Sequence, residues 1–389
     1  MGTLKIQENL IDKIRILKDS SGSHSPSINA IRHVIPELKI NVDACFLSNP
    51  YATELFIKYL EKEIVNTSLL REVLEFYPSQ NKIIASDISE VINISPKNIF
   101  VGNGAIEIIQ ACLHNFCGHK IIVNIPTFSS YYEFVPKDTE VVFYKLDKAQ
   151  NFSLEPKKYI EFVKKHNPST VVIINPNNPD GSYLPLSVLK DIISQLSDVK
   201  NIIIDESFIH FAFEDNDKSQ ISAGELIHQF PNLLVIKSMS KDFGIAGIRA
   251  GYGIMHENKI SSLLKNGYLW NSSGLAEYFF KLYKDKNFLE EYETLRLRYI
   301  DEAQKFFNDL NQFTQLNVYE SKANFALVEI LDGEESFDFV INLLIKYGIY
   351  FRSCSDKIGL DGEFVRIACR TKEENKYIIN SLANYFENK

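Results

Sequence analysis

The sequence of 389 residues has no long hydrophobic run and few cysteines. No apolar segment approaches the roughly 18 residues that a bilayer-spanning helix needs. The five cysteines form no regular framework, which is typical of a reducing compartment; they are Cys45, Cys112, Cys117, Cys354 and Cys369. The first residues, MGTLKIQENLIDKI, are too polar for the apolar core of a signal peptide. We therefore expect a cytoplasmic protein that does not associate with a membrane.

Basic residues are also scarce relative to acidic ones. Lysine and arginine total 42 against 50 aspartates and glutamates, which gives a formal net charge of -8 at pH 7. A general nucleic-acid-binding protein should carry a basic face, so this class is disfavoured and no nucleic-acid partner is expected. At this length, one large domain together with a smaller one is the first expectation.

Six short runs rich in valine and isoleucine predict buried strands. They lie at residues 98–102, 120–124, 140–146, 170–175, 201–206 and 232–238. Continuous apolar runs without alternation are typical of parallel strands that are covered by helices on both faces. Helical patterns, such as that at residues 187–196, separate several of the runs. The order predicts repeated βαβ units and an α/β fold.

Composition divides the chain into three parts. We predict an N-terminal arm (1–45) with a serine-rich loop at 20–26, a large domain (46–270) and a smaller α+β domain (271–389). The elements expected in the last part are a long charged helix at 284–310, strands near 323–330 and 364–368, and a terminal helix from residue 373.

The residues that follow the apolar runs carry the chemistry, because ligands of open α/β sheets bind beyond the carboxyl ends of the strands. Gly104 and Ala105 follow the first run and begin a helix, so their backbone N–H groups favour an anion. A plain tight turn is the alternative, and the third glycine of a dinucleotide fingerprint is absent. Asp205 stands directly at a strand end, where a helix N-cap is the alternative to a functional carboxylate.

The stretch KSMSKDFGIAGIRAGYG, at residues 237–253, places Lys241 and Arg249 among small residues. Ser238, Ser240 and Arg249, with glycines between them, suit a phosphate group. The set expected at this edge of the sheet is Gly104, Ala105, Phe128, Asn178, Asp205, Ser238, Ser240, Lys241 and Arg249. A phosphorylated aromatic cofactor with a ring nitrogen and an aldehyde would use every member, as pyridoxal 5'-phosphate does.

The order NPNNP-x-G, then DESF, then S-x-S-K-x-x-G-x-x-G-x-R-x-G-Y resembles fold-type I pyridoxal-phosphate enzymes of the class I/II aminotransferase family. The most similar groups are histidinol-phosphate aminotransferase and threonine-phosphate decarboxylase, and the likeness runs from about Asn49 to the C-terminus. It implies the fold-type I transferase fold, in which the large domain has a mostly parallel seven-stranded sheet. It also implies that Lys241 forms an imine with the cofactor, that Asp205 pairs with the ring nitrogen, and that Asn178 bonds the ring hydroxyl.

The resemblance implies further contacts. Phe128 would stack on the cofactor ring, and Tyr77 would reach the phosphate of a neighbouring subunit, which predicts a homodimer with shared active sites. Phe208 stands where many aminotransferases have a tyrosine that bonds the ring hydroxyl. Arg366 would bind the substrate carboxylate. The other residues expected to contact a phosphorylated substrate are Asn49, Arg352 and Arg370.

Several details favour decarboxylation of an O-phospho-amino acid, of the phosphoserine or phosphothreonine type, to an amine phosphate. They are PTFS at 126–129, DESFI at 205–209, RSCS at 352–355 and the arginine in RIACRT, Arg370. The main alternative is an aminotransferase that moves an amino group between glutamate and a phosphorylated ketone or aldehyde. A regulatory or structural module on the same fold is disfavoured by the intact Lys241, Asp205 and Arg366. A nicotinamide-dependent dehydrogenase is disfavoured by the incomplete glycine fingerprint.

For the remaining candidate residues, a structural role competes with a functional one. A cluster of possible metal ligands has the wrong spacing for a zinc knuckle, so no metal site is predicted; it comprises Cys112, His114, Cys117 and His119. Tyr131 and Tyr132 either line the site or pack in the core. We expect His210 to be structural.

Overall fold

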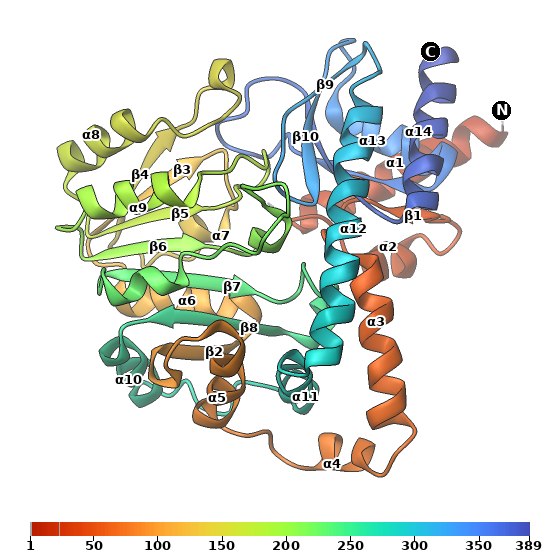
Figure 1. Cartoon of the computed structure of the whole chain (residues 1–389). Helices are drawn as coiled ribbons and strands as arrows, with labels where there is room; N and C mark the ends of the chain where they lie inside the picture. The colour runs from red at the N-terminus through yellow and green to blue at the C-terminus, as the bar shows by residue number, and fades with distance from the viewer. Residues whose placement is uncertain (1, 23) are drawn as a thin grey trace. The chain divides into compact units, whose positions relative to one another are not determined.

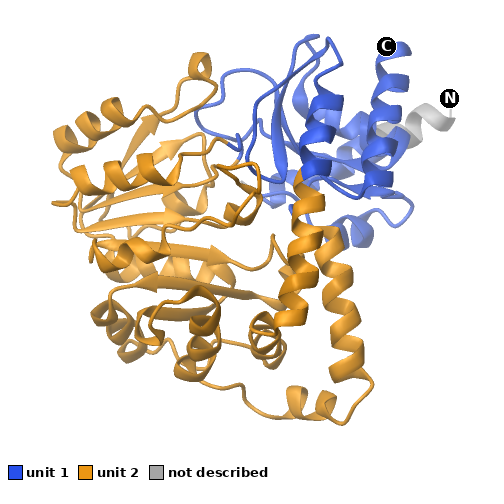
Figure 2. Ribbon diagram, viewed as in Figure 1, with its two compact units in different colours: residues 1–47, 179–181, 301–389 blue, residues 48–178, 182–300 orange. Residues whose placement is uncertain are grey.

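The computed structural model describes residues 2–22 and 24–389 (Figure 1). Ser23, in the predicted serine-rich loop, lies outside the described residues. Contacts divide the chain into two compact units: residues 1–47, 179–181 and 301–389 form unit 1, and residues 48–178 and 182–300 form unit 2 (Figure 2). Residues 271–300, which we assigned to the smaller domain, thus have most of their contacts in unit 2. This follows from α11 (Gly274–Tyr283), whose side chains from Ala276 to Phe280 are all buried.

Unit 2 is built on a seven-stranded sheet of order β2-β8-β7-β6-β5-β3-β4. Its strands are β2 (Ile99–Asn103), β3 (Lys120–Ile125), β4 (Glu140–Lys145), β5 (Thr170–Ile174), β6 (Asn201–Asp205), β7 (Leu233–Ser238) and β8 (Ala250–Met255). Neighbours are parallel except where β8 pairs with β2 and β7. The six predicted strands and the mostly parallel seven-stranded sheet are confirmed. The strand that the apolar runs missed is β8, because Gly251 and Gly253 interrupt its hydrophobic pattern.

Helices connect these strands and cover the sheet (Figure 1). Those of unit 2 are α3 (Pro50–Leu60), α4 (Leu69–Glu75), α5 (Asn81–Ile92), α6 (Gly104–Phe116), α7 (Ser130–Glu133), α8 (Pro156–His166), α9 (Leu186–Gln195), α10 (Glu257–Lys265), α11 and α12 (Lys286–Leu310), which continues into unit 1. The helix α6 packs on β2, β7 and β8. Its apolar face, with Ile108, Ile109 and Leu113, is fully buried in the core beneath the sheet. This packing fixes where the first turn of α6 lies.

The sheet register brings the polar strand ends to one edge. Asp205 of β6 lies beside Ile236 of β7 and Ile174 of β5. Ser238 of β7 pairs with Gly251 of β8. Parallel strands therefore deliver the residues that follow them to a common edge, as expected for a ligand site of an α/β sheet.

Unit 1 is an α+β assembly. A four-stranded antiparallel sheet has the order β12-β13-β10-β9, and β1 pairs with β11 in parallel. The strands are β1 (Val42–Asp43), β9 (Leu316–Val318), β10 (Phe325–Ile330), β11 (Ile349–Tyr350), β12 (Arg352–Ser353) and β13 (Phe364–Ala368). The helices are α1 (Gly2–Ser20), α2 (Ile28–Val34), α13 (Ser336–Tyr347) and α14 (Lys372–Glu387). The predicted strands near 323–330 and 364–368 and the terminal helix are confirmed.

Within residues 2–22 and 24–389, no helix is long and apolar enough to cross a bilayer.

Candidate active site

The first turn of α6 and the side chain of Arg249 form a cradle for an anion. Gly104 has a φ of 72°, and a Cβ added there would collide with the guanidinium group of Arg249. The guanidinium group is held by the backbone: Nη1 donates to the carbonyl of Ala246 at 3.1 Å and Nη2 to that of Asn103 at 3.4 Å. A guanidinium group and the positive end of a helix therefore meet at one point, where an anion is favoured.

The end of β7 completes this cradle with two hydroxyl groups. Ser238 and Ser240 are both buried, and the N–H of Ser240 donates to Oγ of Ser238 at 3.3 Å. Gly251, the register partner of Ser238, has no side chain where a Cβ would lie 2.9 Å from the nitrogen of Ala105. The α6 terminus consequently approaches the β7–β8 pair closely. The structure thus brings together the five residues predicted to bind phosphate: Gly104, Ala105, Ser238, Ser240 and Arg249.

Asp205 is held by two hydrogen-bond donors at the end of β6. Its Oδ2 accepts a hydrogen bond from the Tyr131 hydroxyl at 2.7 Å, and its Oδ1 accepts one from the N–H of Ser207 at 2.8 Å. Burial raises the pKa of this carboxyl, while the hydrogen bonds from Ser207 and Tyr131 oppose the rise. The buried negative charge is unfavourable because it is desolvated, and the two donors fix the orientation of the carboxylate. Such a group is suited to bind a cation. Tyr131, which we left open between site and core, is fully buried and also contacts the site.

Lys241 is positioned from the start of α3. Its backbone carbonyl accepts the N–H of Asn49 at 3.0 Å. Asn49 caps α3, since its Oδ1 accepts the N–H groups of Tyr51 at 3.1 Å and Ala52 at 3.4 Å. Its Nδ2 is buried and has no hydrogen-bond partner among the described residues. Because buried donors are almost always satisfied, this amide marks a place for a ligand atom beside the Lys241 segment.

The asparagine turn after β5 is tied to the turn after β3. Thr127 donates through Oγ1 to Oδ1 of Asn177 at 3.1 Å, and Nδ2 of Asn177 donates to the carbonyl of Pro126 at 3.0 Å. This link fixes the neighbouring residues Phe128 and Asn178 in adjacent turns. Asn178 is buried, and Phe128 packs against the apolar core of unit 2. Asn177 was not among the predicted site residues, because its role depends on a contact between two turns.

A buried ion pair lies directly behind Lys241. Lys237 donates to Asp242, the residue that follows Lys241, and also to the carbonyl of Glu206 at 3.2 Å. Burial raises the pKa of Asp242 to about 6, although Lys237 opposes the rise. His210 lies 3.0 Å from the Tyr292 hydroxyl and 3.5 Å from Asp242, and burial lowers its pKa well below the ordinary range. These contacts agree with a structural role for His210. Phe208, also buried, supplies no hydroxyl group here.

Two of the predicted substrate-binding arginines lie in unit 1, opposite each other on neighbouring strands. Arg352 of β12 pairs in register with Arg366 of β13. Arg352 Nη2 donates to both carboxylate oxygens of Asp356, at 2.7 and 2.9 Å. Arg366 Nη2 donates to the carbonyl of Cys45 at 2.9 Å, and its guanidinium lies 5.4 Å from the ring centre of Phe325. Two cations on one face of a sheet repel each other, so the arrangement favours an anion between them.

Arg370 has a different setting, just past β13. Its N–H donates to Oδ1 of Asn375 at 2.8 Å, and its Nε lies 3.6 Å from a carboxylate oxygen of Glu374. Both partners belong to the first turns of α14, so Arg370 is engaged with that helix. Its predicted contact with substrate stays a prediction.

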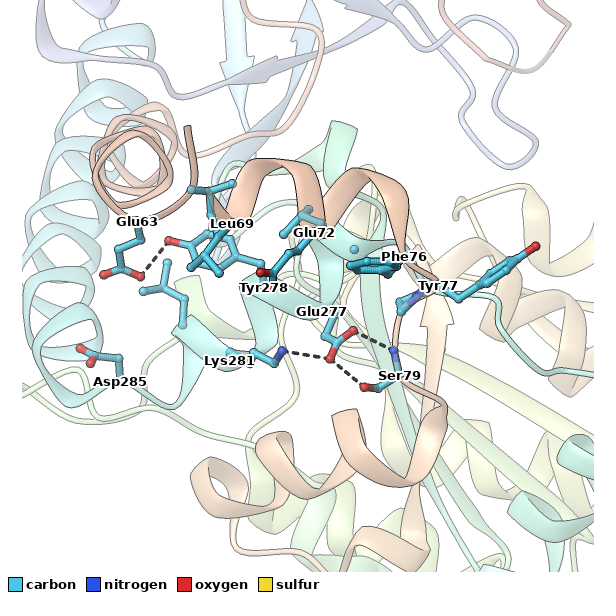
Figure 3. Close-up of a pocket in the computed structure, with 15 residues that line it drawn as sticks. Glu63, Leu69, Glu72, Phe76, Tyr77, Ser79, Glu277, Tyr278, Lys281 and Asp285 are labelled. Carbon is cyan, nitrogen blue, oxygen red and sulfur yellow. Dashed lines mark hydrogen bonds and ion pairs between the residues drawn. The ribbon is translucent and has the colours of Figure 1, made fainter. Parts of the chain in front are cut away.

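Tyr77 lies on the surface of unit 2, at one end of a pocket of about 450 Å³ (Figure 3). Its side chain is 89% exposed, its ring centre lies 6.4 Å from that of Trp270, and its hydroxyl points away from the pocket. Inside the pocket, Glu277 accepts hydrogen bonds from the N–H and the hydroxyl of Ser79, each at 2.8 Å. Tyr77 therefore faces outward, where a second molecule can reach it.

The candidate metal cluster is dispersed into separate contacts. Cys112 and Cys117 are buried in the apolar core. His114 bonds the carbonyl of Phe134 at 3.1 Å, and His119 bonds Oγ of Ser169 at 2.7 Å. Across the described part of the chain, no group of three or more histidines, cysteines and acids is arranged to hold a metal ion.

Fold and site together define an α/β enzyme of the aminotransferase type. The chain belongs to the aminotransferase class I and II family, whose model matches residues 48–382. It is 60% identical over 381 residues, 98% of each chain, to a Campylobacter jejuni protein named L-serine phosphate decarboxylase. It is 46% identical over 367 residues, 94% of this chain and 93% of the other, to the L-serine phosphate decarboxylase of Sulfurospirillum multivorans. A solved structure described as a decarboxylase from Sulfurospirillum multivorans matches with a TM-score of 0.92, 44% identity and coverage of 96% and 95% of the two chains. The family and the fold-type I fold predicted from the motifs are confirmed.

Proposed function

We propose that this protein is a pyridoxal-phosphate-dependent decarboxylase that converts O-phospho-L-serine into O-phosphoethanolamine and CO₂. The observation that carries the proposal is the 60% identity, over 98% of both chains, to a relative named L-serine phosphate decarboxylase. The preference for decarboxylation over transamination, drawn from the sequence, agrees with the names of both relatives.

The residues of unit 2 fit the cofactor. Gly104, Ala105, Ser238, Ser240 and Arg249 would hold its phosphate group, since the cradle combines backbone N–H groups, hydroxyls and a guanidinium. When bound, pyridoxal phosphate supplies a sink for the electron pair that is released at Cα of the substrate.

Four side chains would orient the cofactor ring. The carboxylate of Asp205 would face the protonated ring nitrogen, and this pairing would lower the pKa that burial raises. Asn178 would donate to the ring hydroxyl, and Phe128 would stack on the ring face. Phe208 has no hydroxyl group and would offer no second donor to that ring hydroxyl.

Lys241 and the arginines would act on the substrate. Lys241 would hold the cofactor covalently and release it when the substrate amine binds. Arg366 would bind the carboxylate, and Arg352, Arg370 and Asn49 would bind the remaining polar groups. The bond between Cα and the carboxylate would break with loss of CO₂, and the ammonium of Lys241 would deliver a proton to Cα. The product retains the amine and the phosphate.

The active unit that we propose is a homodimer in the cytoplasm. Tyr77 is 89% exposed, which is the condition for it to complete the phosphate site of a partner subunit. A two-fold dimer makes this exchange reciprocal. The five cysteines are all free and buried, which agrees with a reducing compartment.

Phosphorus NMR of the reaction mixture tests the substrate assignment. The purified enzyme is given O-phosphoserine, O-phosphothreonine or histidinol phosphate in separate reactions, and serine is followed by proton NMR. We expect conversion of O-phosphoserine to O-phosphoethanolamine and little reaction with serine, since the arginines match a doubly anionic substrate. Equal efficiency on serine and O-phosphoserine would contradict the proposal.

A further inference from the structure

Lys357 lies beside the two paired arginines of unit 1, Arg352 and Arg366. Its backbone is fixed by a turn, because its N–H donates to the carbonyl of Cys354 at 2.9 Å and its carbonyl accepts the N–H of Leu360 at 3.3 Å. The side chain is partly buried. Within the described residues its ammonium group makes no hydrogen bond or ion pair. A lysine in this setting normally reaches either solvent or an acid.

The charges around Lys357 are strongly unbalanced. Lys357 is influenced by Asp356 and the thiol of Cys354 in its own loop, by Arg352 of β12 and by Arg366 of β13. Asp356 is the one acid in this group, and it already accepts from Arg352 and, at 3.1 Å, from Lys18 of α1.

The nearby thiols do not correct this imbalance. Burial raises the pKa of Cys45 to about 11 and also raises that of Cys354, so both stay neutral at pH 7. Four cations thus share a single carboxylate: Lys18, Arg352, Lys357 and Arg366.

This arrangement is unfavourable for the protein alone. Burial, followed by the repulsion from Arg352, lowers the pKa of Lys357 to about 8. The donors of Arg352 are largely engaged, since Nη2 binds Asp356 and Nη1 binds the carbonyl of Ser353. An anion with two negative charges would relieve the repulsion, and Lys357 offers it an ammonium group with three uncommitted protons.

We propose that Lys357 binds the substrate's phosphate group directly. Through this contact, the cations around Asp356 would select a substrate that carries a dianionic phosphate. The proposal rests on the proposed function, and it adds a residue that the sequence analysis missed. The quoted motif RSCS ends at Ser355, two positions before Lys357. In this division, Arg366 binds the carboxylate and Lys357 binds the phosphate beside Arg352.

Two substitutions and a matched control test the role in catalysis. Lys357→Met keeps the length of the side chain and removes its charge, and Lys357→Arg keeps the charge. Lys376→Met removes an exposed lysine on α14 in the same unit. At pH 7 we expect Lys357→Met to raise KM for O-phosphoserine about tenfold or more, with a much smaller change in kcat, because the lost contact is one of binding. Lys357→Arg and Lys376→Met should keep KM within about threefold.

Phosphate binding supplies a readout that does not depend on turnover. The cofactor-loaded proteins are heated with and without inorganic phosphate, so that the cofactor occupies its own phosphate cradle. We expect phosphate to raise the Tm of the parent, of Lys357→Arg and of Lys376→Met, and to raise that of Lys357→Met much less. Without phosphate, the Tm of Lys357→Met at pH 7 should equal or exceed that of the parent, because an unfavourably buried charge is gone.

The pH dependence separates Lys357 from the arginines. The affinity of the parent for inorganic phosphate should fall as the pH rises through about 8, where the Lys357 ammonium loses its proton. Arg352, Arg366 and Asp356 do not change charge in this range. The Lys357→Arg variant should show no such fall.

The outcomes distinguish this inference from the proposed function. If Lys357→Met matches the parent in KM and in stabilisation by phosphate, the inference is wrong, even where the parent decarboxylates O-phosphoserine. A parent that phosphate does not stabilise would also overturn it. The parent could instead fail to decarboxylate O-phosphoserine, while the substitution Lys357→Met still removes the stabilisation by inorganic phosphate. In that case the anion site is supported and the proposed function is wrong.

Discussion

The hydroxyl of Tyr131 donates a hydrogen bond to Oδ2 of Asp205 at 2.7 Å, and both side chains are buried. Tyr131 belongs to α7, the short helix that follows β3, whereas Asp205 ends β6. The contact stabilises the charged form of a carboxyl whose pKa burial raises. The tyrosine therefore acts on the proposed cofactor contact through Asp205 and is a positioning residue.

Replacing Tyr131 with phenylalanine should weaken catalysis without preventing cofactor binding. The pKa of Asp205 should rise further, so the acid limb of the kcat profile should move to higher pH. We expect kcat at neutral pH to fall about tenfold, the effect of about 1.4 kcal/mol. The control is Tyr132→Phe, which alters a neighbouring ring that packs edge-on against Phe143. An unchanged pH profile in Tyr131→Phe would show that the hydrogen bond does not tune Asp205.

Lys241→Ala should abolish turnover while some cofactor stays bound. The phosphate cradle does not include the Lys241 side chain, so its contacts persist in the variant. Borohydride should attach the cofactor irreversibly to Lys241 of the parent and to no lysine of the variant, as mass spectrometry of the digested proteins would reveal. Lys265→Ala, on α10, is a matched control in the same unit. Native turnover by Lys241→Ala would refute the assignment of the catalytic amine.

The buried pair of Lys237 and Asp242 should be important for stability. Asp242→Asn leaves Lys237 buried without its counter-charge, which costs about 3–5 kcal/mol of unfolding free energy. Adding Lys237→Met should restore a large part of this loss, because the unpaired charge is then removed. Urea unfolding of the two single variants and the double variant measures the coupling. Additive losses would mean that the two residues do not act as a pair.

Tyr77→Phe should weaken cofactor binding by about 1–2 kcal/mol, the value of one charge-assisted hydrogen bond. Mixed dimers test whether the site is shared. A subunit with Lys241→Ala supplies an intact Tyr77, and a subunit with Tyr77→Phe supplies an intact Lys241. Dimers that combine the two should regain one site with parental affinity. A monomer that is fully active at high dilution would contradict the shared site.

The strands could be predicted because buried parallel strands need continuous apolar runs, and such runs are recognisable in the sequence alone. The strand β8 was missed since close approach of α6 demands Gly251, and glycine removes the hydrophobic signal. The anion cradle was predictable because each of its two parts is a short local motif: Gly104 and Ala105 directly follow an apolar run, and Ser238, Ser240 and Arg249 lie within residues 237–253.

The contacts missed by the sequence analysis join segments far apart in the chain. Tyr131 meets Asp205, and Asn177 meets Thr127, across separate strand-end turns. Lys357 becomes distinctive only when β13 places Arg366 opposite Arg352. A lysine in a polar loop carries no local signal of burial or of missing partners.

The most direct test of the account follows CO₂ from O-phosphoserine labelled at its carboxyl carbon, with no keto acid present. The parent enzyme, loaded with cofactor, should release labelled CO₂ and O-phosphoethanolamine in equal amounts over many turnovers, and Lys241→Ala should release neither. A single stoichiometric conversion of the cofactor to its amine form, without labelled CO₂, would identify an aminotransferase and contradict the account.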